Sequence, residues 1–114
     1  MRDSLKVMVE LSAAQLAVLE RLRERGFQFM AFPLYEQRIG VRKGNCAVLL
    51  DPAEGQVRVF AEPAYLVAGN LSVVVTAGAE KFFVWKQNRV PVTRERLDEL
   101  ERFRRELDEV LALA

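Results

Sequence analysis

The part of the chain that most restricts the fold lies between residues 27 and 90, where short β-prone runs alternate with turn residues. This alternation is typical of an antiparallel meander and predicts a mostly antiparallel sheet of about five to seven strands. The runs are FQFMAF, QRIGV, CAVLL, QVRVFA, EPAYLVAGN, LSVVVT and KFFVWKQ. DPAEG is the clearest turn, because Asp and Pro favour its first positions and Gly55 tolerates a positive φ. It predicts a hairpin between residues 46–50 and 56–61.

Two amphipathic patterns flank this region. Ser12 with Gln15 three residues later forms a capping box, and Gly26 suits a helix end, so we predict a helix near residues 12–25. Thr93 is a suitable N-cap for a second, longer helix near 93–113. A half-buried strand is predicted over residues 5–11, LKVMVEL. The sequence therefore predicts a single α+β domain over residues 1–114, with the sheet flanked by an N-terminal and a C-terminal helix.

Composition excludes several kinds of chemistry. The chain has no histidine and a single cysteine, Cys46, so histidine-dependent catalysis and thiolate-clustered metal sites are excluded. No phosphate-binding glycine pattern is present, and no two carboxylates outside the predicted helices have a spacing that would place them together. Cys46 lies in an apolar run typical of a core. We therefore expect no enzymatic activity, no cofactor and no metal. No apolar run approaches the roughly 20 residues of a membrane span, the start MRDSLKVMVE does not resemble a signal peptide, and the lone cysteine favours the cytoplasm.

The predicted strands differ in how their apolar residues are distributed. QRIGVR and QVRVFA alternate with arginine, whereas CAVLL, LSVVVT and KFFVW have few or no charges on either face. The second kind should be central and covered on both sides, or covered on one side by a partner. Two helices cover roughly one face of such a sheet, so the other face needs a second copy, closure into a barrel, or a ligand.

Association of two copies is the leading interpretation, because two-fold dimers are the commonest oligomers. Phe83 and Trp85 are expected on one face of their strand, and Phe82 and Val84 on the other. We predict a non-catalytic interaction or assembly module that acts as a homodimer, with Trp85 as its main contact. An unidentified protein partner is a further option. The predicted interface comprises Trp85, Phe83, Phe82, Val84, Val73, Val75, Phe103 and Leu107.

Two alternatives belong to other functional classes. Lys81, Phe83, Trp85, Gln87 and Arg89 would share one face and resemble a base-stacking platform. A site for single-stranded nucleic acid or another anion would then use Arg38, Arg42, Arg58, Lys81 and Arg89. The net charge of only +1 argues against it. The other alternative is a carrier of a small apolar ligand, which requires a cavity.

Overall fold

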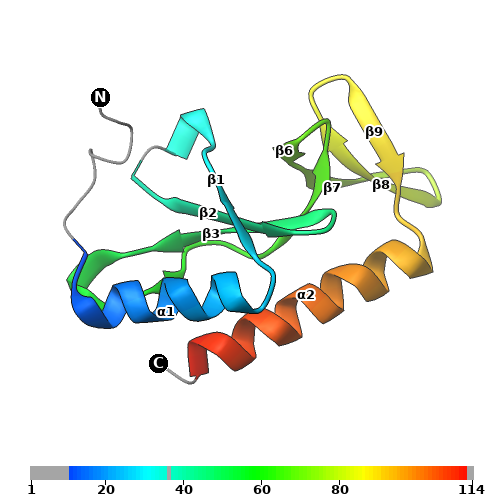
Figure 1. The fold of residues 1–114 in the computed structure, drawn as a ribbon. Coiled ribbons are helices and arrows are strands. Elements are labelled where there is room, and N and C mark those ends of the chain that lie inside the picture. Colours follow the sequence, from blue (N-terminus) through cyan, green and yellow to red (C-terminus); the bar gives the residue numbers. More distant parts are fainter. Residues whose placement is uncertain (1–10, 36, 113–114) are drawn as a thin grey trace.

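The computed structural model describes residues 11–35 and 37–112, which form an α+β fold with a helix near each end (Figure 1). Helix α1 spans Ala13–Glu24 and helix α2 spans Arg94–Ala112. The predicted fold class and both predicted helices are confirmed. Residues 5–10 of the predicted N-terminal strand lie outside the described residues.

The strands form two antiparallel sheets, where the sequence predicted one. The larger sheet has the order β1-β2-β3-β5-β6, with β4 also paired to β3, and the smaller has the order β7-β8-β9. The larger sheet contains β1 (Gln28–Met30), β2 (Ile39–Lys43), β3 (Cys46–Asp51), β4 (Arg58–Val59), β5 (Ala64–Val67) and β6 (Asn70–Leu71). The smaller sheet contains β7 (Val73–Ala77), β8 (Glu80–Trp85) and β9 (Asn88–Pro91), and short 3-10 turns occupy Pro33–Tyr35 and Ala53–Gly55.

Strand β3 is the centre of the larger sheet and is covered on both faces. Val48 and Leu50 belong to the main core beneath the helices, and Ala47 and Leu49 pack on the opposite face against Phe32. The prediction that CAVLL is central and doubly covered is therefore confirmed. The predicted hairpin after it is also present, although β4 contributes only two residues to the pairing with β3.

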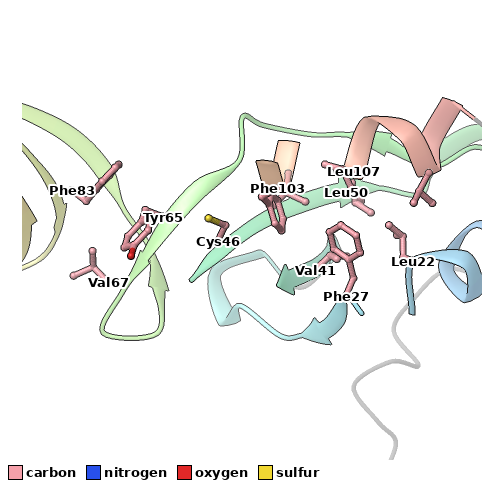
Figure 2. Packing of buried hydrophobic residues seen from close by; sticks show 12 residues of the cluster. Leu22, Phe27, Val41, Cys46, Leu50, Tyr65, Val67, Phe83, Phe103 and Leu107 are labelled. Atoms are coloured by element: carbon pink, nitrogen blue, oxygen red, sulfur yellow. The ribbon is translucent and has the colours of Figure 1, made fainter. Parts of the chain in front are cut away.

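Both helices cover the same face of the larger sheet (Figures 1 and 2). Leu22 of α1 and Leu107 of α2 are fully buried in one cluster with Val41 of β2. Phe27 and Phe103 meet edge to face, with ring centroids 5.5 Å apart. This aromatic pair joins the segment after α1 to the middle of α2.

Polar contacts fix the two ends of α1. At its start, the predicted capping box between Ser12 and Gln15 is present. Gln15 is only 2% exposed, and its amide nitrogen donates to the carbonyl oxygens of Pro52 (2.5 Å) and Gln56 (2.9 Å). The beginning of α1 is thereby attached to the turn between β3 and β4.

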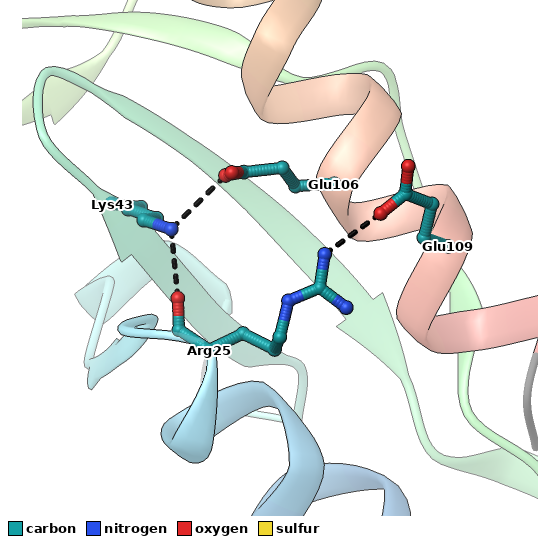
Figure 3. Close-up of polar contacts among 4 residues, drawn as sticks. All are labelled: Arg25, Lys43, Glu106 and Glu109. Atoms are coloured by element: carbon teal, nitrogen blue, oxygen red, sulfur yellow. Dashed lines mark hydrogen bonds and ion pairs between the residues drawn. The ribbon is translucent and has the colours of Figure 1, made fainter.

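The other end of α1 is linked to β2 and α2 (Figure 3). Lys43 Nζ donates to the carbonyl oxygen of Arg25 (2.7 Å) and to Glu106 (3.0 Å), while Arg25 pairs with Glu109 at 2.7 Å. These charges are partly exposed, so each ion pair contributes little by itself. The bond to Arg25 has a second role, because it satisfies a carbonyl group that the helix end leaves without a partner.

The molecule is elongated, with principal extents of 48 × 30 × 21 Å and a radius of gyration of 14.9 Å. A compact chain of this length would have a radius of gyration of about 13 Å. The excess fits the position of β7-β8-β9, which extends away from α1 at one end of the larger sheet (Figure 1). More of the surface of the smaller sheet is therefore exposed to solvent than would be the case for a sheet enclosed by the fold.

Candidate interaction surface

Strand β7 is an exposed sheet edge. All five of its residues are exposed, including Val73 at 63%, Val74 at 57% and Val75 at 42%. Within residues 11–35 and 37–112, β7 pairs with β8 alone. Two alternatives were predicted for LSVVVT, and the first, a central strand covered on both sides, is wrong within the described residues. The second, coverage by a partner, stays a prediction.

The pairing of β7 with β8 shows which side chains share a face. Val73 lies opposite Val84 and Val75 lies opposite Phe82, so these four apolar residues share one face, the outer face. Arg89 of β9 lies on the same face, over the Phe82 ring. On the other face, Phe83 is 1% exposed and stacks on Tyr65, with ring centroids 4.9 Å apart (Figure 2). Trp85 is half-buried against the same core. The predicted division of β8 into two faces matches this burial.

Several residues of the predicted interface belong to the interior of the chain. Phe83, Phe103 and Leu107 are 1%, 3% and 0% exposed, respectively, within the chain's own core. A partner would not contact them directly, so the candidate surface is smaller than the sequence suggested. It consists of the outer face defined above together with the β7 edge.

The backbone of β7 presents unpaired groups along that edge. A two-residue loop joins Ala77 to its partner Glu80, and such a loop makes the flanking pair exchange both hydrogen bonds. Since bonded and non-bonded pairs alternate, Val73, Val75 and Ala77 direct their N–H and C=O groups towards β8. The groups of Val74 and Thr76 point away from β8, towards the open edge.

The next strand pair obeys the same alternation. If Thr76 and Lys81 form a non-bonded pair, the backbone groups of Lys81 must face β9. Its carbonyl oxygen does accept a hydrogen bond from Val92 N, at 3.0 Å. The hydrogen bond between Val92 and Lys81 therefore agrees with the assignment that the backbone groups of Val74 and Thr76 point to the open edge of β7.

The other sheet edges in the described part of the chain are short or carry features that oppose strand pairing. β1 and β6, the two edges of the larger sheet, have only three and two residues, whereas β7 has five. β9 contains Arg89 and ends in Pro91, whose nitrogen has no hydrogen to donate. β4 is two residues long and contains Arg58. β7 has neither charge nor proline along its length. β7 therefore lacks the features that usually keep a sheet edge from pairing with another strand.

The five cations of the nucleic-acid alternative are divided between the two sheets. Arg38 lies 4.0 Å from the centre of the Phe60 ring, and Arg42 donates to the Gly44 carbonyl at 2.8 Å. Arg89 lies opposite Val84 and 4.4 Å from the centre of the Phe82 ring. The prediction that Arg89 shares the face of Lys81 is therefore wrong, because Arg89 is on the next strand, where pairing places it on the outer face. Arg58, on the larger sheet, has a polar or electrostatic contact of its own.

The chemistry of Cys46 is that of a core thiol. Its side chain is fully buried, and burial together with the nearby Glu99 carboxylate raises its pKa to about 12, against the opposing effect of Arg102. A reactive thiolate requires the opposite environment, one in which nearby positive charge lowers the pKa of the thiol.

In the part of the chain that the structure describes, no three His, Cys, Asp or Glu residues are grouped as metal ligands would be. Nor does any described helix have the length and apolar character needed to cross a membrane.

Two surface hollows bear on the ligand-carrier alternative. One, of about 660 Å³, lies between α1 and the β4 region and includes Gln15, Val18 and Val59. The other, of about 330 Å³, lies between Glu62-Pro63 and the first half of α2. Residues 73–91 line neither of them, so these hollows are separate from the exposed sheet.

Sequence reasoning missed Val74 and Thr76, whose backbone groups form the open edge. It treated the uncharged strand as one whose faces are covered by the fold or by a partner, and thus considered side chains rather than unpaired backbone groups. A usable signal was present, since residues 63–79 contain no charge at all. Comparison with protein-family models, with curated proteins and with solved structures gives no match.

Proposed function

We propose that this chain is a non-catalytic interaction module that forms a homodimer through the β7-β8-β9 sheet, and that it acts in the cytoplasm. The observation that carries the proposal is the β7 edge, where an uncharged strand exposes Val73, Val74 and Val75. Such edges are usually short, charged or covered in proteins that stay monomeric. An edge with none of these features is best explained by a partner that covers it.

The apolar outer face supports the same function. Val73, Val75, Phe82 and Val84 adjoin the open edge, so a partner at β7 would meet backbone groups and apolar side chains together. Contiguous apolar surface on a small protein is commonly an association site. Trp85 is expected to support this surface from beneath, since it packs on the core face of β8.

A non-catalytic role is supported by the state of Cys46, which is the only cysteine. Its burial and raised pKa disfavour the thiolate form that nucleophilic catalysis uses. The lone cysteine also suits a reducing compartment, in which disulfides are rare.

Molar mass in solution tests the proposal. Light scattering after size exclusion should give twice the 13.0 kDa of one chain at high concentration, falling towards 13.0 kDa on dilution. A mass of 13.0 kDa at every concentration up to about 500 µM would contradict the proposal, because mass action favours the dimer as concentration rises.

A further inference from the structure

We infer that β7 pairs with β7 of a second copy, antiparallel, about a two-fold axis that passes beside Val75. This inference rests on the proposed function and specifies its geometry. Val75 of each copy would face Val75 of the other, and Val74 would face Thr76. The two small sheets would then join into one continuous sheet.

The direction of the backbone groups fits this register. Val74 and Thr76 direct their N–H and C=O groups to the open edge, and they are symmetrically placed on either side of Val75. In the two-fold arrangement, each Val74 exchanges both hydrogen bonds with Thr76 of the other copy. Val75 falls at a non-bonded pair, where facing side chains approach most closely.

The side chains of β7 are compatible with self-pairing. Two-fold symmetry places Val75 opposite itself, so a charge at that position would face a like charge. Residues 73–77 contain no charged side chain, and Val73 would face Ala77 across the axis. All the cross-strand pairs are therefore apolar or neutral, and such pairs favour association.

Self-pairing at β7 is favoured over pairing of β7 with β9 of another copy. By the alternation described above, Arg89 and Pro91 present the outward groups of β9. Pro91 has no N–H to donate, and Arg89 would bring a charge to the edge of an apolar strand. A β7–β9 contact would also be head-to-tail and could continue into a filament, whereas the β7 pair closes after two copies.

A strand pair of this length buries less than the roughly 1,200–2,000 Å² typical of stable complexes, so the dimer is expected to dissociate on dilution. Charge variants at Val75 test the register directly, because this outer-face residue is 42% exposed and a charge there is tolerated by the monomer. Val75→Lys and Val75→Glu should each be monomeric, with a mass of 13.0 kDa, at concentrations where the unmodified chain is dimeric. An equimolar mixture of the two variants should regain the dimer mass, because opposite charges then face each other.

A second pair of variants separates edge pairing from packing of the outer faces. Val74→Pro removes an N–H that points to the open edge and leaves the bonds to β8 and the outer face unchanged. Val74→Thr retains that N–H and is the matched control. Edge pairing predicts a monomer for Val74→Pro and a dimer for Val74→Thr. If Val74→Pro stays dimeric, the copies meet through their outer faces, and the inference is wrong.

A cross-link identifies the facing residues even if the dimer is weak. In a Cys46→Ala background, Val75→Cys should form a disulfide-linked dimer on mild oxidation, whereas Val73→Cys alone should not. A mixture of Val73→Cys and Ala77→Cys chains should form the mixed dimer, since these positions face each other. Equal cross-linking of Val73→Cys and Val75→Cys would overturn the register. If the unmodified chain is dimeric and the Val75→Lys and Val75→Glu variants are equally dimeric, the inferred register is wrong. The proposed function, a homodimer, would still stand.

Discussion

Replacing Gln15 by glutamate is expected to destabilise the fold strongly at neutral pH. The amide nitrogen of Gln15 donates to the carbonyl oxygens of Pro52 and Gln56, and its oxygen accepts from Ser12 N at 2.7 Å. A carboxylate keeps the acceptor of the capping box but places an oxygen against the two carbonyl oxygens. The substitution therefore preserves the shape of the side chain and replaces two hydrogen bonds by two repulsive contacts between oxygen atoms.

The size of the effect follows from these contacts. Two hydrogen bonds are lost at about 1 kcal/mol each, and burying the unpaired charged oxygen adds about 1–3 kcal/mol, so the loss should be about 3–5 kcal/mol. This is a large part of the roughly 5–15 kcal/mol by which small domains are stable. Gln15→Met is the uncharged comparison, since it has similar length and loses both donated bonds together with the bond from Ser12 N. It should cost about 2–3 kcal/mol.

The pH dependence distinguishes the two variants. A protonated carboxyl group can donate to one of the carbonyl oxygens, so the folded state raises the pKa of the introduced glutamate above its unfolded value of about 4.3. A raised pKa means that the variant retains most stability below about pH 4.3 and loses it as pH rises through the folded pKa. Near pH 4, Gln15→Glu should therefore be at least as stable as Gln15→Met, because the protonated carboxyl group can still accept from Ser12 N and donate one bond. At pH 7, Gln15→Glu should be the less stable of the two.

Urea unfolding followed by fluorescence of Trp85, the only tryptophan, measures these free energies. The two variants are compared with the unmodified chain at several pH values between about 4 and 8, where ordinary carboxylates complete their titration. The reasoning is refuted if Gln15→Glu is as stable as Gln15→Met at pH 7, or if the gap between them does not change with pH.

Three further predictions concern other positions. Gly40→Ala should lower the free energy of unfolding, measured in urea, by about 2–4 kcal/mol, because a Cβ at this position would collide with Met30 O and lie 2.7 Å from the Phe32 ring. A loss below about 1 kcal/mol would contradict this prediction. Ala68→Asn should raise the free energy of unfolding by about 0.5–1 kcal/mol, because Ala68 has φ 52° in a two-residue hairpin loop where Asn before Gly is preferred. The variant should therefore have a higher Tm, and a lower Tm would count against the prediction. The pKa of Cys46 is raised to about 12, so at pH 8 its thiol should react with a thiol reagent about 1,000-fold more slowly in the folded chain than in urea. Comparable rates in the two states would show that the thiol is accessible in the folded chain.

Local patterns predicted the elements whose signals are contained in a few residues. Ser12 and Gln15 specified the start of α1, and Asp51 through Gly55 specified the reversal after β3, because capping and turn formation depend on neighbouring side chains. Helix α2 begins after Thr93 as predicted, and Phe103, Leu107 and Val110, which helical spacing places on one face, are its buried residues. The contacts that join the elements were not predictable in this way. Gln15 meets Pro52 and Gln56 only after the chain has folded.

The division into two sheets could not be predicted, because it depends on how β5, β6 and β7 follow one another in space. The hydroxyl of Ser72 donates to the Tyr65 carbonyl oxygen at 2.6 Å, and the chain leaves the larger sheet at that point. This contact is invisible in the apolar pattern of LSVVVT. For the same reason, apolar residues on both faces of KFFVW indicated a covered strand but not what covers it. Phe83 is covered by the chain's own core, whereas Phe82 faces outward.

The uncharged segment 63–79 contains both a strand that the chain itself covers and a strand that it leaves exposed, and this difference bears on function. Its first part, β5, is uncharged because it pairs with β3 and β6 and buries Tyr65 and Val67. Its last part, β7, has no such constraint from the other residues that the structure describes, and a charge at Val75 would remain in contact with solvent. In a chain with 29% charged residues, an exposed edge without charge therefore requires another cause. The proposed pairing with a second copy would supply that cause. It would tolerate apolar residues at every β7 position and penalise a charge that faces its own copy. On this argument, the Val75→Lys and Val75→Glu variants should fold as stably as the unmodified chain in the monomer and differ from it in association alone.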